Sequence, residues 1–81
     1  MNWDEEIDAI GLLCPLPVLK LRKQIKNLKT GSIVRVLADD PAATLDIPHF
    51  CNENGHKFLS SRLLSGLNYK KGSKEYFVQK A

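Results

Sequence analysis

The 81-residue sequence has no long hydrophobic run, because its longest uncharged stretch extends only from Ala9 to Leu19 and contains two prolines. Such a segment is too short, and too interrupted by proline, to span a lipid bilayer. Residues 4–6 are acidic, whereas a secretory signal peptide begins with positive charge. We therefore expect a cytoplasmic protein that does not act at a membrane.

Cysteine is also scarce, since Cys14 and Cys51 are the only two in the chain. Two cysteines cannot form the dense disulfide framework of a small secreted domain, so we predict free thiols. Neither a Cys-x-x-Cys nor a His-x-x-x-His spacing occurs, although His49, Cys51 and His56 lie near one another in sequence. This pattern predicts no metal site, a solvated His49, and a Cys51 thiol that packs inertly beside Phe50.

Acidic residues are missing between Asp8 and Asp39, a segment that contains several basic residues. The uneven layout predicts a basic face on the first helix, although the net charge of the chain is only +3. No aromatic residue that could stack on a base lies among these lysines, which favours an acidic protein surface as the partner over a nucleic acid. We expect partner docking at Lys20, Lys23 and Lys26.

Length and composition predict one globular domain over residues 1–81. Hydrophobic residues make up 43% of the chain and charged residues 26%, which is typical of a folded soluble domain. A chain this small buries only roughly 60–65% of its unfolded surface, so we expect its chemistry to lie near the surface.

The hydrophobic pattern predicts the order β-α-β-α-β-β. The alternating segment 6–10 and the β-branched segment 33–38 are typical of strands, and the spacing of three and four between apolar residues predicts a helix over 15–29. Pro48 lies too deep for one helix from Pro41, so we predict a turn over 41–45 and a helix capped by Asp46 over 46–54. Strands over 57–64 and 75–80 complete an α/β two-layer sandwich, with a four-stranded mixed sheet and both helices on one face.

The run Leu12-Leu13-Cys14-Pro15-Leu16-Pro17-Val18 carries the main functional signal. Proline fits the first position of a helix, so Pro15 predicts that Cys14 is the N-cap, with the backbone N–H groups of Leu16 and Val18 facing its sulfur. Because a helix N-terminus carries partial positive charge, we expect it to favour the thiolate and lower the pKa of Cys14. Asp39 and Asp40 precede Pro41 in the same way and predict a helix cap, with orientation of the Cys14 loop as the alternative.

The whole chain resembles the TusA/SirA-like sulfur carriers, a family named for a Cys-Pro-x-Pro motif at the start of its first helix. Besides Cys14-Pro15-Leu16-Pro17, the resemblance rests on Asp8-Ala9-Ile10-Gly11, on segment 38–44 and on segment 46–51. It implies a sulfurtransferase-type carrier that accepts sulfane sulfur from a cysteine desulfurase as a persulfide on Cys14. The carrier would then pass the sulfur to an acceptor protein of a relay, as in 2-thiolation of tRNA wobble uridine, without a cofactor. The resemblance also implies that Pro15 and Pro17 shape the turn and that Asp39 and Asp40 frame it.

Two positions depart from the family pattern. Leu16 stands where members that act in tRNA thiolation often have glutamate, and the stretch from Leu63 to Lys74 is longer than the usual hairpin. These differences leave open whether the chain serves tRNA thiolation, sulfur oxidation or cofactor sulfuration.

Two other functions remain as alternatives to the carrier. A thiol-based redox protein ordinarily needs a resolving cysteine, and Leu16 and Pro17 occupy the places where a Cys-x-x-Cys motif would have one. A basic nucleic-acid-binding or regulatory module would agree with the pI of about 9.0, with weak binding at most. We expect a monomer, because an exposed Cys14 loop must enter the active site of another protein.

Overall fold

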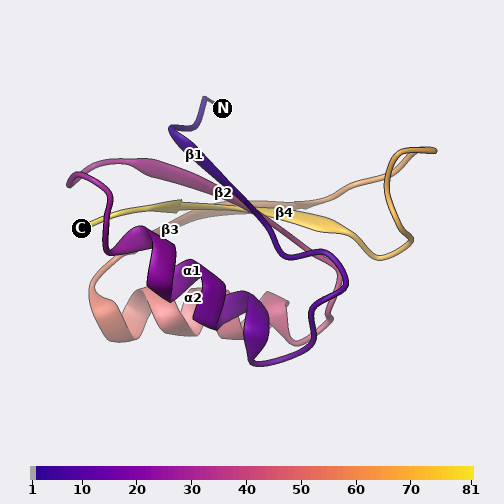
Figure 1. The fold of residues 1–81 in the computed structure, drawn as a ribbon, viewed down its shortest axis with the longest axis horizontal. Coiled ribbons are helices and arrows are strands. Elements are labelled where there is room, and N and C mark those ends of the chain that lie inside the picture. Colours follow the sequence, from indigo (N-terminus) through magenta and orange to yellow (C-terminus); the bar gives the residue numbers. More distant parts are fainter. Residues whose placement is uncertain (1) are drawn as a thin grey trace.

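A computed structural model describes residues 2–81, which form one sheet and two helices (Figure 1). The order β-α-β-α-β-β is the predicted one. Its elements are β1 (Glu5–Asp8), α1 (Leu16–Ile25), β2 (Ile33–Ala38), α2 (Ala43–Asn54), β3 (Lys57–Leu63) and β4 (Lys74–Gln79).

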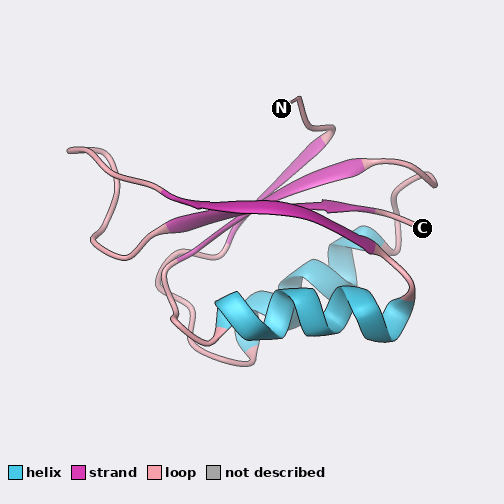
Figure 2. Ribbon diagram, turned by 180° about the vertical axis from the view of Figure 1, so that it is seen from behind, coloured by secondary structure: helices cyan, strands magenta, loops and turns pink. Residues whose placement is uncertain are grey.

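The four strands form a mixed sheet in the order β1-β2-β4-β3. β1 pairs with β2 in parallel, whereas β4 is antiparallel to both β2 and β3. Figure 2 shows both helices on one face of this sheet, with the other face uncovered. The predicted two-layer sandwich is therefore confirmed, including the mixed sheet.

The core lies between the sheet and the helices. Alternate residues of β2, namely Val34, Val36 and Ala38, are buried toward the helices, whereas Arg35 lies on the opposite face. The helices contribute apolar side chains at spacings of three and four. The buried helical residues in this core are Leu21, Ile25, Ala43, Ile47, Phe50 and Cys51.

Both helices differ in length from the prediction. α1 ends at Ile25, four residues before Lys29, although Leu28 still packs against the core. α2 begins at Ala43 rather than Asp46 and continues through Pro48. The backbone N–H of Asp46 already donates to the Ala42 carbonyl at 2.9 Å, so the helix is established before Pro48, whose missing donor interrupts it at one position only. Gly55 ends α2 as predicted, at a φ of 74° that favours glycine.

The β3–β4 connection extends beyond the sheet (Figure 1). Leu64 and Ser73 are buried at its base, where the Leu64 N–H donates to the Ser73 carbonyl at 2.8 Å. Leu63, Leu67 and Tyr69 are exposed. Within residues 2–81, neither helix has the length and hydropathy needed to cross a membrane.

Candidate functional site

Cys14 lies in the loop that joins β1 to α1, next to the loop that joins β2 to α2. β1 and β2 are parallel neighbours, so their carboxyl ends meet at the same edge of the sheet and place the two loops side by side. This edge is where α/β folds commonly place their chemistry. The topology thus explains how segments about 26 residues apart form one site.

Asp39 and Asp40 hold the Cys14 loop through its backbone. The Asp39 carboxylate accepts the N–H of Gly11 at 2.8 Å, and Gly11 has a φ of 85°, which disfavours any residue with a side chain. The Asp40 carboxylate accepts the N–H of Cys14 itself and, through its other oxygen, that of Ala42 at 3.2 Å. Asp40 therefore caps the turn that begins at Pro41, as predicted, and also orients the Cys14 loop, whereas Asp39 orients the loop only. The N-cap residue of α2 itself is Ala42.

The turn around the cysteine is tighter than the sequence predicted. Pro15, not Cys14, is the N-cap of α1, and Pro17 lies buried in the first turn. The N–H of Leu16 donates to the Leu13 carbonyl at 2.8 Å and is therefore engaged away from the sulfur. The side chains of Leu13 and Leu16 are both exposed beside the thiol.

The Cys14 thiol is exposed and donates to the Asp46 carboxylate, with 3.1 Å between Sγ and Oδ2. This hydrogen bond, partial desolvation and the negative charges of Asp46 and Asp40 raise the pKa of Cys14 above its ordinary value. The predicted lowering of this pKa by the helix N-terminus is therefore wrong. Two carboxylates act on Cys14, and the N–H of Leu16, which was expected to face the sulfur, bonds to the Leu13 carbonyl instead.

A cavity of about 310 Å³ opens beside Cys14, between the start of α1 and one face of α2. His49 is largely exposed, as predicted, and lines this cavity together with Cys14 and Asp46, which the sequence indicated only as a helix cap. The missed signal is the spacing of residues 46, 49, 50 and 53, which places them on one helical face opposite the cysteine. The complete lining is Cys14, Pro15, Val18, Asp46, His49, Phe50, Glu53 and Asn54.

The lysines predicted to dock a partner lie on α1 or, for Lys26, at its C-cap, and none of them lines this cavity. Lys20 is half-buried, and its ammonium donates to the Asp8 carbonyl at 2.6 Å, which ties the start of α1 to the end of β1. Lys23 and Lys26 are exposed. The basic face of α1 is thus separate from the acidic surroundings of Cys14.

Cys51 differs from Cys14 in its burial. Its side chain is 1% exposed, and burial raises its pKa to about 11. Both cysteines are free thiols. Across residues 2–81, the His, Cys, Asp and Glu side chains form no group of three or more that could hold a metal ion.

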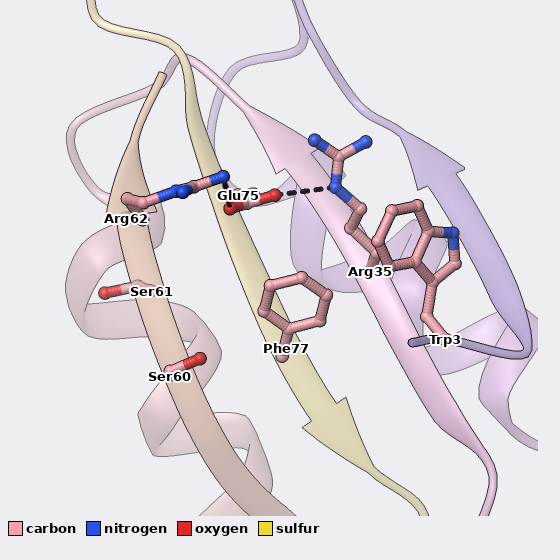
Figure 3. A pocket seen from close by; sticks show the side chains of 7 residues that line it. All are labelled: Trp3, Arg35, Ser60, Ser61, Arg62, Glu75 and Phe77. Atoms are coloured by element: carbon pink, nitrogen blue, oxygen red, sulfur yellow. Dashed lines mark hydrogen bonds and ion pairs between the residues drawn. The ribbon is translucent and has the colours of Figure 1, made fainter. Parts of the chain in front are cut away.

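A larger cavity of about 410 Å³ lies on the uncovered face of the sheet, away from Cys14 (Figure 3). Its centre is Glu75, whose carboxylate accepts hydrogen bonds from Arg35 and Arg62, each at 2.7 Å. The Arg35 guanidinium also stacks over the Trp3 ring, 4.8 Å from its centroid, and Trp3 lies against Phe77. Arg35 also pairs with the Glu6 carboxylate at 2.8 Å, so two arginines face two carboxylates. We therefore assign this face to stability.

Comparison with known proteins agrees with the fold. A family model described as sulfurtransferase TusA matches residues 5–71. Among solved structures, the SirA-like protein from Desulfitobacterium hafniense is similar, with a TM-score of 0.72 and 27% sequence identity. That match covers 94% of this chain and 96% of the other. The segment matched by the family model contains Cys14, the two loops that frame it and the whole of α2.

Proposed function

Because the chain belongs to the TusA sulfurtransferase family, we propose that it is a sulfur carrier that holds sulfane sulfur as a persulfide on Cys14. The observation that carries the proposal is the position of this thiol. It is exposed at the mouth of a cavity, and Asp40 and Asp46 hold its backbone and its sulfur from two sides. A cysteine desulfurase is the proposed donor, and a downstream relay protein the acceptor.

The proposed transfer exchanges one sulfur atom between two thiols. The Cys14 thiolate attacks the terminal sulfur of the donor persulfide, so that a new S–S bond forms as the donor S–S bond breaks. The donor cysteine leaves as a thiolate and takes up the proton that Cys14 lost. Attack by an acceptor thiolate on the Cys14 persulfide reverses these roles, and neither step requires an oxidant, a metal or an organic cofactor.

The surroundings of Cys14 suit a carrier better than a disulfide reductase. Pro15 and Pro17 restrict the turn, and the carboxylates of Asp39 and Asp40 fix the backbone before it, at Gly11 and Cys14. The exposed Leu13 and Leu16 side chains provide apolar contact for a partner. Farther from the sulfur, Lys20, Lys23 and Lys26 would dock acidic groups of that partner. Cys51 is buried and so poorly placed to resolve a Cys14 disulfide.

The pathway that we propose is 2-thiouridine synthesis in tRNA, with the carrier acting as a cytoplasmic monomer. The family membership supports a relay with other proteins in general terms. Two free thiols agree with a reducing compartment.

Intact-protein mass spectrometry after incubation with a cysteine desulfurase and L-cysteine tests the proposal. The wild-type chain and a Cys51→Ser variant gain sulfur that dithiothreitol removes, whereas Cys14→Ser gains none. A Cys14→Ser chain that still gains sulfur would refute Cys14 as the carrier residue. An active desulfurase that loads none of the three chains would refute the proposed donor.

A further inference from the structure

The cavity beside Cys14 combines an apolar floor with a charged rim. Pro15, Val18 and Phe50 supply carbon surface, whereas Asp46, His49, Glu53 and Asn54 supply polar groups, all from α2. The His49 imidazole lies 3.6 Å from the Glu53 carboxylate, one helical turn away. The side chains of His49 and Glu53 are both largely exposed, so they are available to a partner.

Negative charge dominates around the sulfur. Asp46 of α2 bonds to the sulfur, and Glu53 lies farther along the same helical face. Asp40, in the β2–α2 loop, bonds to the backbone N–H of the same cysteine. In the part of the chain that the structure describes, no lysine or arginine lines the cavity, and α1 contributes only apolar groups to it. Carboxylates beside a thiol oppose formation of an anionic sulfur. Sulfur transfer nevertheless requires that anion.

We propose that the cavity receives an arginine side chain of the partner protein, whose guanidinium pairs with Asp46 and Glu53 and so releases the Cys14 thiol from Asp46. This inference rests on the proposed carrier function and names the chemistry of the partner at the same site. The thiol proton passes to water as the guanidinium replaces it at Asp46, and no other bond to sulfur breaks. The carrier thiol is then largely protonated and less reactive in the free protein, and docking activates it.

The shape of the cavity favours arginine over a simple cation. Its carbon walls at Val18 and Phe50 can cover the methylene stem of a long side chain, which buries its stem while the charged end reaches the rim. A guanidinium is planar and carries several donors, so one group can bond two carboxylates. Docking also places this positive charge close to the sulfur that must become anionic.

Reagents of opposite charge test this inference without a sulfur donor. The rate of Cys14 modification is measured for a cationic trimethylammonioethyl and an anionic sulfonatoethyl methanethiosulfonate, with each rate divided by that of a free small thiol. We expect the cationic reagent to be favoured by about tenfold at Cys14 at low salt, because carboxylates lie within the Debye length of the sulfur. Peptide mapping separates Cys14 from Cys51.

Three variants show which carboxylates cause the preference for the cationic reagent. Asp46→Asn and Glu53→Gln each reduce the preference several-fold, and raising the salt concentration reduces it in the wild type. Glu5→Gln is the matched control, because it removes one exposed carboxylate at the far end of β1 and leaves the preference unchanged. Circular dichroism verifies that each variant is folded.

Equal normalised rates in the wild type would overturn the inference, as would a preference that survives both substitutions on α2. If Cys14 accepts sulfur but reacts equally fast with both reagents, the carrier function stands and the arginine site is refuted. If Cys14 strongly prefers the cationic reagent but accepts no sulfur, the carrier function is refuted and only a cation-selective cavity rim is supported.

Discussion

Cys14 and Asp46 form the closest pair of reactive groups in the site. The thiol donates to the carboxylate, and the neighbouring charge of Asp40 acts in the same direction. A proton held in this way keeps the thiol neutral at physiological pH. The carrier cysteine therefore differs from reactive cysteines whose surroundings are electropositive.

Asp46→Asn is expected to make Cys14 more reactive in the free protein. Removing the charge lowers the pKa of Cys14 and increases the thiolate fraction at neutral pH, so alkylation by neutral iodoacetamide speeds up by about threefold or more. The pH dependence of the alkylation rate checks this, and in the variant its midpoint moves to lower pH. An unchanged midpoint would show that Asp46 does not hold the proton.

Cys51 is expected to limit stability at alkaline pH. Burial raises its pKa from 9.0 to about 11, so the folded chain binds this proton more tightly than the unfolded chain. The resulting stability is complete below the unfolded pKa and is lost as the pH rises toward the folded value. Urea unfolding measures the free energy of unfolding at neutral pH and at about pH 10. The decrease between the two pH values should be smaller for Cys51→Ala than for the wild type. Equal losses in the two chains would contradict this role.

The sequence predicted the identity of the reactive residue but not its electrostatics. Cys14 stands out because prolines at 15 and 17 mark the start of a helix, which is local information. Asp46 and Asp40 approach it from 32 and 26 residues away, and only the pairing of β1 with β2 brings them there. A rule based on helix ends alone therefore gave the wrong direction for the pKa.

At the scale of elements, the Cys14 loop depends on hydrogen bonds between two loops, β1–α1 and β2–α2, which meet at one edge of the sheet. Asp39 accepts from Gly11 and Asp40 from Cys14, so the β2–α2 loop determines the conformation of the β1–α1 loop. Both strand positions were predictable from β-branched and alternating residues. The start of α2 could not be predicted, because Pro48 suggested that the helix begins after residue 45. In the structure, backbone hydrogen bonds before Pro48 already form the helix from Ala43.

Asp40→Ala is expected to destabilise the fold and loosen the Cys14 loop. It leaves two backbone N–H groups without their acceptor, which costs about 1–3 kcal/mol in the free energy of unfolding. Urea unfolding measures the loss, and hydrogen exchange at the Cys14 amide should become faster.

Lys70→Ala serves as the control for this change. It removes an exposed ion pair with Asp39, whose atoms are 3.4 Å apart, and should cost less than about 1 kcal/mol. Equal losses in Asp40→Ala and Lys70→Ala would contradict the role assigned to Asp40.

At the scale of the whole molecule, the two faces of the sheet have different roles. One face packs against the helices and positions the Cys14 site, whereas the other carries Glu75 between two arginines (Figure 3). The Glu75 side chain is 4% exposed although no helix covers it. Its burial depends on Arg35, Arg62 and Trp3, a cluster that the sequence did not reveal because its members come from separate strands and the N-terminal segment.

Glu75→Ala is expected to reduce stability without affecting the chemistry of Cys14. It leaves the largely buried Arg35 without one of its two carboxylate partners, at a cost of about 2–4 kcal/mol in the free energy of unfolding. Urea unfolding measures the loss, and sulfur loading by a desulfurase should be unchanged at a temperature where the variant is folded. Loss of loading in the folded variant would assign this face to partner docking instead.

The most direct test of the central claim is a complete cycle of loading and discharge. The chain is loaded with radiolabelled sulfur from a desulfurase, separated from the donor, and mixed with a protein that has an acceptor cysteine. The account predicts that label leaves Cys14 and appears on the acceptor, and that Cys14→Ser transfers none. Label that stays on the chain, or that reaches the acceptor equally well with Cys14→Ser, would contradict a carrier function for this protein.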